Sequence, residues 1–213
     1  MEIVKIGVIG MGQMGRGIAE VCALSGFEVL VTDVDRDTIN KSRSHIFEDL
    51  KKLEKKNKIK SGKSEVAIDL IISVKDFSEF NSCDLIIEAA TEKEHVKKKI
   101  FSDLKPFVKC NAILATNTSS ISVTRLASGT EKPENFMGLH FMNPVPLMNL
   151  VELVRGIATS DATYETLQDF VVKLGKTSSV SEDFPAFIVN RVLMPMINEA
   201  IYSLYEGVGN VEN

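Results

Sequence analysis

Residues 5–17 read Lys-Ile-Gly-Val-Ile-Gly-Met-Gly-Gln-Met-Gly-Arg-Gly, and the start of the fold can be predicted from them. Ile3 to Ile9 is a run of mostly branched apolar residues, which is typical of a strand buried on both faces. The pattern Gly10-x-Gly12-x-x-Gly15 follows at once, and apolar residues then recur at helical spacing until Gly26, where the helix is expected to end. The stretch therefore predicts a strand, a tight turn and a helix.

The glycine pattern and a later acid together predict a dinucleotide site. In such a unit Gly10 allows the tight turn, Gly12 lets the backbone approach a pyrophosphate, and Gly15 lets the helix pack against the strand. Asp33 ends the next predicted strand about 20 residues after the glycines, where a carboxylate can bind ribose hydroxyls. This acid favours NAD over NADP because it repels a 2′-phosphate, although Arg36 nearby would partly offset the repulsion.

Composition and charge narrow the class of protein. The 213 residues, 44% apolar and 25% charged, are an ordinary soluble globular composition, and the formal net charge of −4 argues against nucleic-acid binding. Cys22, Cys83 and Cys110 lack metal-site spacing and are expected to be free thiols in a reducing compartment. No apolar run is long enough for a membrane span, and the first predicted strand leaves no room for a signal peptide. We therefore expect a cytoplasmic protein.

Strands and helices alternate through the first part of the chain. Further strands are predicted at residues 27–32, 71–74, 84–89 and 112–116, with helices at 35–60, 64–70 and 94–107 between them. This alternation predicts an α/β fold with a doubly wound, mostly parallel sheet, which binds ligands beyond the carboxyl ends of its strands. Gly10, Asp33, Glu92 and Ser119 all follow such ends, so we expect them to share one rim of the sheet.

The pattern changes after Pro133. Strands are predicted at residues 136–141, 150–155 and 177–181, a helix at 163–174, a linker at 183–186 and an apolar helix at 187–206. We accordingly divide the chain into an NAD-binding Rossmann-like domain, residues 1–183, and a linker with one helix, residues 184–213.

Seven lysines stand between Lys51 and Lys63, at the end of the predicted helix 35–60. Such a run is usually the solvated end of a helix. The alternative is a binding surface for a polyanionic ligand, and the lysine pattern alone leaves both interpretations open.

Of the three histidines, His140 is the candidate for proton transfer. His45 and His95 are interpreted as surface side chains, whereas His140 lies at the end of a predicted strand in the turn-rich stretch Gly-Leu-His-Phe-Met-Asn-Pro-Val-Pro. Glu152 lies 12 residues later between apolar neighbours, where a buried acid needs a partner. Two strands joined by a tight loop would bring Glu152 beside His140, where it would orient the ring. A structural histidine and a surface acid remain the alternative at this point.

Taken together, these motifs resemble one family. The chain contains Gly-Met-Gly-Gln-Met-Gly-Arg-Gly-Ile-Ala19, Asn-Thr-Ser-Ser120, Gly-Leu-His-Phe-Met-Asn-Pro-Val-Pro146, Leu-Val-Glu152 and Phe-Ile-Val-Asn-Arg191. In this order they resemble the L-3-hydroxyacyl-CoA dehydrogenases, most of all the bacterial enzymes of this family that act on 3-hydroxybutyryl-CoA. The histidine element with its downstream glutamate is far more specific than the glycine pattern.

The resemblance implies roles for residues that the patterns alone leave undefined. It implies a catalytic group of His140, Glu152, Ser119 and Asn190. It places the cofactor against Gly10, Gly12, Gly15, Met14, Asp33, Glu92, Lys97, Asn117 and Asn143. Lys52 and Lys56 match lysines that meet the phosphates of coenzyme A, with Ser119 on the substrate oxygen, so here the polyanion interpretation gains support. No metal is implied.

The activity implied is NAD-dependent interconversion of (S)-3-hydroxyacyl-CoA, with 3-hydroxybutyryl-CoA as the expected substrate, and 3-oxoacyl-CoA, in fatty acid or butyrate metabolism. Members of the family continue into an all-α C-terminal domain that closes the cleft and forms a homodimer, and here only its first helix is expected. That helix would then expose an apolar stripe, so we expect self-association. The alternatives are a non-catalytic NAD-binding fragment and a related hydroxyacid dehydrogenase of the hydroxyisobutyrate or gulonate type.

The chain departs from the family pattern at two positions. Ala186 stands where glycine is usual after the linker proline, which would strain the hinge, and Asn149 stands where a lysine is common.

Overall fold

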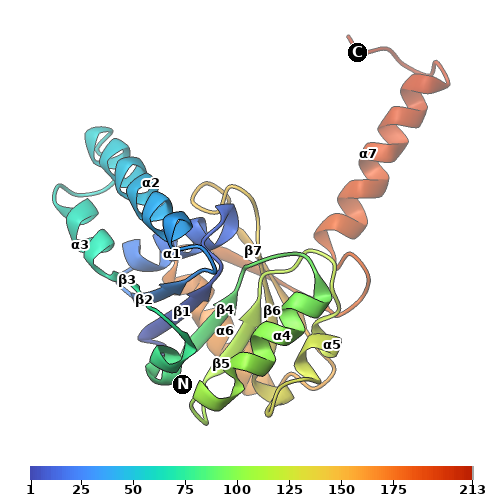
Figure 1. Ribbon diagram of the computed structural model, residues 1–213. Coiled ribbons are helices and arrows are strands. Elements are labelled where there is room, and N and C mark those ends of the chain that lie inside the picture. Colours follow the sequence, from blue (N-terminus) through green and yellow to red (C-terminus); the bar gives the residue numbers. More distant parts are fainter. Residues whose placement is uncertain (213) are drawn as a thin grey trace.

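The computed structural model describes residues 1–212, which form one eight-stranded sheet flanked by helices (Figure 1). In spatial order the strands run β3-β2-β1-β4-β5-β6-β7-β8. Their bounds are β1 (Lys5–Ile9), β2 (Glu28–Thr32), β3 (Ile71–Ser73), β4 (Leu85–Glu88), β5 (Ile113–Thr116), β6 (Phe136–Phe141), β7 (Leu150–Arg155) and β8 (Thr177–Glu182). The helices are α1 (Gln13–Leu24), α2 (Arg36–Lys55), α3 (Lys63–Asp69), α4 (Glu94–Leu104), α5 (Val123–Ala127), α6 (Asp161–Lys173) and α7 (Val189–Tyr205).

The sheet is mostly parallel, as predicted. Each neighbouring pair is parallel except β6 and β7, which are antiparallel. Only residues 142–149 connect these two strands, and so short a connection cannot cross over the sheet as a parallel pairing requires. The antiparallel register places His140 directly opposite Glu152.

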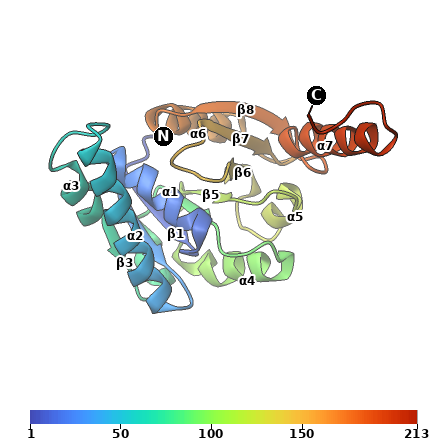
Figure 2. The ribbon, with the colours of Figure 1, turned by 90° about the horizontal axis from the view of Figure 1, so that it is seen from above.

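Helices cover both faces of the sheet, and each face has its own hydrophobic core (Figure 2). On one face α1, α2, α3 and α6 contribute buried apolar residues, among them Ile18, Ile46 and Phe170. On the other face α4 and α5 do the same, with Phe101 and Leu126 as examples. The sheet is therefore doubly wound, and its central strands are buried on both sides, which explains why their sequences are almost wholly apolar.

Helix α7 is different from the others. It extends away from the sheet (Figures 1 and 2), and none of its residues is buried. Its exposed apolar side chains include Val192, Met194, Met196, Ile201 and Tyr205. The proposed boundary at residues 183/184 falls in the segment between β8 and this helix.

Three local features differ from the sequence prediction. Helix α2 ends at Lys55 rather than residue 60, and Asn57 adopts a left-handed conformation just after it. Helix α7 begins at Val189 rather than residue 187, because Ala186 and Phe187 have positive φ angles that no right-handed helix contains. The short helix α5 was not predicted, since five residues carry little periodic signal.

Two expectations on composition can be compared with the structure. Cys22 and Cys83 are buried free thiols, whereas Cys110 is a free thiol that is exposed. Among residues 1–212, no helix has both the length and the hydrophobicity needed to cross a bilayer.

Candidate functional site

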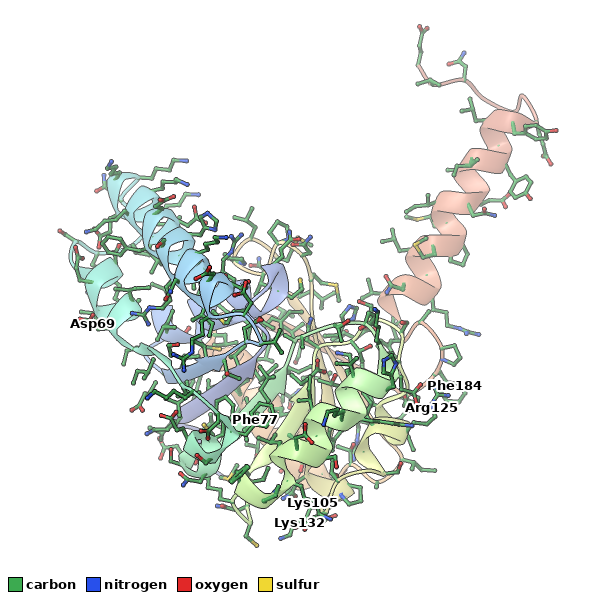
Figure 3. All side chains as sticks on the ribbon, in the orientation of Figure 1. Asp69, Phe77, Lys105, Arg125, Lys132 and Phe184 are labelled. Atoms are coloured by element: carbon green, nitrogen blue, oxygen red, sulfur yellow. The ribbon has the colours of Figure 1, made fainter. Side chains whose placement is uncertain are left out.

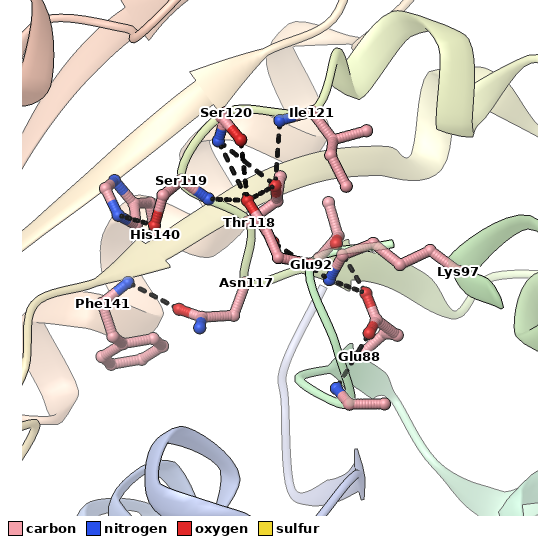
Figure 4. A network of polar contacts seen from close by, with 12 residues as sticks. Glu88, Glu92, Lys97, Asn117, Thr118, Ser119, Ser120, Ile121, His140 and Phe141 are labelled. Carbon is pink, nitrogen blue, oxygen red and sulfur yellow. Dashed lines mark hydrogen bonds and ion pairs between the residues drawn. The ribbon is translucent and has the colours of Figure 1, made fainter. Parts of the chain in front are cut away.

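The predicted rim is present at the carboxyl ends of the central strands. Gly10 follows β1, Asp33 follows β2, Glu92 follows β4 and Ser119 follows β5. Because these strands are parallel neighbours, their ends meet at one edge of the sheet. Figure 4 shows the part of this edge where the segments after β4 and β5 meet the end of β6.

The three glycines of the turn have different surroundings. A Cβ on Gly15 would stand 1.7 Å from the carbonyl oxygen of Gly10, so only glycine lets α1 approach the strand this closely. Gly10 has a φ of +92°, and a Cβ there would stand 2.4 Å from the Cα of Ala90. Gly12, in contrast, has no such neighbour within 4 Å. The backbone at Gly12 is therefore open to a ligand.

The start of α1 suits the phosphates of a dinucleotide. Its N-cap is Gly12, which makes no side-chain cap hydrogen bond, and its first turn contains no acidic residue. Backbone N–H groups at the start of a helix attract anions when no side chain satisfies them. The sequence Gly10 to Gly15 thus builds an anion site without a cationic side chain.

Two hollows lie on either side of this turn. The first has a volume of about 320 Å³ and is lined by Gly10, Asp33, Phe77 and Ile100 among others. Asp33 is held there because Oδ2 accepts the N–H of Met11 at 2.6 Å and Oδ1 accepts the N–H of Asp35 at 3.1 Å. Apolar walls and one fixed carboxylate fit the adenosine half of NAD.

The second hollow has a volume of about 310 Å³ and is more polar. Its lining includes Gly12, Met14, Glu92, Asn117 and Ser119, all of which the sequence assigned to the site. Because this hollow adjoins the first across the glycine turn, the two together fit the two halves of a dinucleotide. The residues present therefore fit NAD.

Glu92 binds the loop after β5 (Figure 4). Its Oε1 accepts hydrogen bonds from Thr118 Oγ1 at 2.6 Å, Ser119 N at 2.8 Å and Ser120 N at 3.1 Å. These hydrogen bonds fix the backbone of Ser119. Asn117, two residues before Ser119, accepts a hydrogen bond from the N–H of Phe141 through Oδ1 at 2.9 Å. This bond joins the loop to the end of β6.

Lys97 lies beneath the rim and does not line the hollow. It is fully buried, and its Nζ is 2.6 Å from Glu88 Oε2 and 3.9 Å from Glu92 Oε2. Glu88 also accepts a hydrogen bond from Thr116 Oγ1 at 2.7 Å and one from the N–H of Ala90 at 2.9 Å. The ammonium group therefore acts on the site through Glu88 and Glu92. The contact with Glu88 was not predicted from the sequence.

His140 and Glu152 are in contact. Nδ1 of His140 lies 3.0 Å from Oε2 of Glu152, and Nε2 lies 3.1 Å from Oγ of Ser119. Both members of the pair are buried, at 5% and 0% exposure. A carboxylate on one ring nitrogen orients the imidazole and stabilises its protonated form, which leaves the other nitrogen free to exchange a proton.

Both carboxylate oxygens of Glu152 are held. Its other oxygen, Oε1, accepts the backbone N–H groups of Ile188 at 2.7 Å and Val189 at 3.1 Å. Burial raises the pKa of the Glu152 carboxyl, but the hydrogen bonds from His140, Ile188 and Val189 outweigh burial and hold the pKa below its usual range. The carboxylate is therefore ionised at neutral pH. Sequence reasoning missed the contact with residues 188 and 189.

Asn190, in the first turn of α7, also reaches the site. Its Nδ2 lies 3.5 Å from the carbonyl oxygen of Ser119, so the amide stands next to the serine. All four predicted catalytic residues are thus brought together from β6, β7, the loop after β5 and α7.

A third hollow, of about 340 Å³, lies between α1, the end of α2 and the loop after β6. Its lining includes Lys52 and Lys56, while Asn143 in its wall accepts a hydrogen bond from Gln13 at 3.0 Å. Lys52 is exposed and pairs with Asp49 at 2.7 Å. Glu20 lines the same hollow, and burial together with the nearby charge of Asp49, opposed by that of Arg16, raises its pKa to about 7.

Comparison with known proteins agrees with this geometry. Residues 5–184 match the family described as 3-hydroxyacyl-CoA dehydrogenase, NAD binding domain. The chain is 56% identical to a 3-hydroxybutyryl-CoA dehydrogenase of Bradyrhizobium diazoefficiens, over 99% of this chain and 72% of that protein. It is 43% identical to the human mitochondrial hydroxyacyl-coenzyme A dehydrogenase, over 96% of this chain and 67% of that protein.

The fold of the chain is also similar to that of solved structures. The crystal structure of (S)-3-hydroxybutyryl-CoA dehydrogenase PaaH1 from Ralstonia eutropha superimposes with a TM-score of 0.95 at 40% identity, covering 99% of this chain and 75% of that one. The crystal structure of FadB2 from M. tuberculosis gives a TM-score of 0.93 at 37% identity, covering 100% of this chain and 75% of that one.

Proposed function

The chain belongs to the 3-hydroxyacyl-CoA dehydrogenase family, an NAD-dependent family of oxidoreductases, and we propose that it interconverts (S)-3-hydroxybutyryl-CoA and acetoacetyl-CoA. The observation that carries this proposal is the contact series from the buried Glu152 through the buried His140 to Ser119, which lines the hollow where NAD fits. The similarity to 3-hydroxybutyryl-CoA dehydrogenases supports the choice of substrate.

The proposed mechanism uses His140 as the general base. In the oxidation direction, Nε2 of His140 takes the proton of the 3-hydroxyl group while Ser119 Oγ, 3.1 Å from that nitrogen, donates a hydrogen bond to the substrate oxygen. NAD, when bound, would supply the acceptor for the hydride that leaves C3 of the substrate. Glu152 holds the Nδ1–H and stabilises the imidazolium that results. In the reverse direction His140 returns the proton to the oxygen.

The remaining residues bind and orient in this proposal. Gly10, Gly12 and Gly15 admit the pyrophosphate to the start of α1, and Asp33 binds the adenosine ribose. Met14, Glu92 and Asn117 line the nicotinamide side, with Lys97 holding Glu92 from beneath. Asn143 lines the third hollow, where it accepts a hydrogen bond from Gln13. Asn190 fixes the substrate near its thioester. The carboxylate of Asp33 makes NADP the less favoured cofactor.

The direct test is NADH oxidation by this chain with acetoacetyl-CoA, with NADPH in parallel. Turnover with NADH supports the proposal. NADH binding without turnover would instead support a non-catalytic NAD-binding fragment, and turnover of free 3-hydroxy acids in preference to thioesters would support a related hydroxyacid dehydrogenase. Titrating NADH by fluorescence beside the assay separates these three outcomes.

We also propose that Lys52 and Lys56 bind the phosphates of coenzyme A. Exposed charge pairs are worth about 0.2–1 kcal/mol each, so the Lys52→Ala/Lys56→Ala variant should raise the KM for acetoacetyl-CoA by about two- to thirtyfold. The loss should shrink at high ionic strength, because salt screens exposed charges.

A thioester without the nucleotide, acetoacetyl-N-acetylcysteamine, should show no such loss. The matched control is Lys55→Ala/Lys58→Ala, which removes the same charge from the same end of α2 at lysines outside the hollow. Equal losses in the two double variants would mean that only the net charge of this helix end matters.

The last proposal concerns α7, through which we expect the chain to associate with a second copy. Its apolar side chains, among them Val192, Met194, Ile197 and Ile201, are exposed along the helix, and surfaces of this kind mark interaction sites. Sedimentation velocity over a hundredfold concentration range should show a monomer–dimer equilibrium that Met194→Glu/Ile201→Glu abolishes. A single monomeric species at every concentration would contradict this proposal.

A further inference from the structure

Two hydrogen bonds hold the ring nitrogens of His140. Glu152 binds Nδ1 and Ser119 lies against Nε2, so these contacts restrict rotation of the ring about its Cβ–Cγ bond. Phe187 lies against it, with ring centroids 5.9 Å apart and an interplanar angle of 64°. This edge-on contact restricts the ring further, and such aromatic pairs contribute about 0.5–1.5 kcal/mol beyond the area they bury.

The two residues after Phe187 hold the other member of the pair. The N–H groups of Ile188 and Val189 both donate to Glu152 Oε1, at 2.7 Å and 3.1 Å. Three successive residues therefore restrain the dyad, one through its ring and two through their backbones. They come from the segment that leads into α7, which lies 35 or more residues after Glu152 in the chain.

The backbone of this segment is strained. Ala186 has a φ of +68° and Phe187 a φ of +52°, and the left-handed region costs a residue with a side chain about 1–2 kcal/mol. Such strain persists only where surrounding contacts compensate for it. Here the compensating contacts are the burial of Phe187, which is 3% exposed, and the hydrogen bonds to Glu152.

The other end of the segment is fixed independently. Asp183 accepts hydrogen bonds from Ser122 Oγ at 2.6 Å and from the N–H groups of Val123 and Thr124 at 2.9 Å and 2.8 Å, at the start of α5. Phe184 is 67% exposed and lies at the surface (Figure 3). Of Phe184 and Phe187, only Phe187 packs against the His140–Glu152 pair.

We propose that Phe187 is a positioning residue for the dehydrogenase reaction: with the backbone of Ile188 and Val189 it fixes the orientation of the His140–Glu152 pair. The inference rests on the proposed function, since it assigns His140 the proton transfer. In this proposal, residues 187–189 at the start of α7 affect the turnover rate through the orientation of His140.

The first experiment compares three Phe→Leu variants. Phe187→Leu should lower kcat for acetoacetyl-CoA reduction about ten- to a hundredfold, because small misplacements of a catalytic group are costly. KM and NADH affinity should stay within about twofold, because the glycine turn and Asp33 come from other segments. Phe101→Leu, in the same hydrophobic core but on α4, and Phe184→Leu, on the surface, should leave kcat nearly unchanged.

A double-mutant cycle with Glu152→Gln tests whether Phe187 acts through the dyad. If it does, adding Phe187→Leu to Glu152→Gln should lower kcat by much less than Phe187→Leu does alone. The effect of Phe101→Leu should instead be the same in both backgrounds. Equal losses of kcat in Phe187→Leu and Phe101→Leu, or multiplicative effects throughout the cycle, would overturn the proposal.

A spectroscopic readout separates this inference from the proposed function. If the wild-type chain does not reduce acetoacetyl-CoA, the proposed function fails, yet the imidazole ¹H–¹⁵N signals of His140 still report its orientation. A protected Nδ1–H signal is expected in the wild type and in Phe101→Leu, and should be lost or shifted in Phe187→Leu. An unchanged signal in Phe187→Leu would overturn the positioning role whatever the activity.

Discussion

His140→Ala should lower the rate of NADH oxidation with acetoacetyl-CoA by about 10² to 10⁴, the usual contribution of general acid–base catalysis. The alanine removes the imidazole that is placed to exchange a proton beside Ser119, whose Oγ lies 3.1 Å from Nε2. NADH affinity should stay nearly unchanged, because the glycine turn and Asp33 do not depend on β6. Steady-state rates and a fluorescence titration of NADH measure the two quantities.

The matched control is His95→Ala. His95 is exposed on α4, so its loss removes an imidazole of the same size without touching the dyad. Its rate should equal that of the wild type. Near wild-type turnover in His140→Ala would remove the proposed role of His140, and a large loss of NADH affinity would mean that the histidine acts on cofactor binding.

The cofactor half of the fold could be predicted because its signals are local. The run of apolar residues, the spacing Gly10-x-Gly12-x-x-Gly15 and the acid at Asp33 lie within 33 residues, and each has a physical reason that does not depend on the rest of the chain. The contact between His140 and Glu152 could also be predicted. Two strands joined by a short loop can only be antiparallel neighbours, and the structure places these residues opposite each other.

The contacts that hold the site in place could not be predicted in this way. Glu88 and its partner Lys97 are nine residues apart in the sequence, and Glu152 and its partner Ile188 are 36 residues apart. The local sequence around neither glutamate indicates which residue it contacts. The same holds for the boundary of α7. The apolar periodicity that predicted a helix at residues 187–206 includes Phe187. In the structure Phe187 has a φ of +52° and lies outside the helix, because its ring packs against His140. Tertiary contacts decided both features.

Glu152→Gln is expected to have an effect on turnover second only to that of His140→Ala. The carboxylate has two acceptor oxygens, one for His140 and one for the N–H groups of Ile188 and Val189. A glutamine amide has only one, so its NH₂ group must face a donor on one side. We expect kcat to fall by about 10² to 10³, since the imidazolium also loses its counter-charge. Glu182→Gln, which removes an exposed carboxylate from neighbouring β8, is the control.

The same substitution should change how stability depends on pH. The folded-state pKa of Glu152 lies below the ordinary value of 4.5, so its ionised form contributes stability that is fully present above that value. This contribution is lost as the pH falls through the depressed folded-state pKa, because the protonated acid can no longer accept from both partners. Urea unfolding of the wild type between pH 7 and pH 3 should therefore show an acid loss of stability that is smaller in Glu152→Gln. Parallel curves would mean that the pKa of Glu152 is the same in the folded and the unfolded chain, which would contradict the effect of the hydrogen bonds from His140, Ile188 and Val189 on this carboxyl.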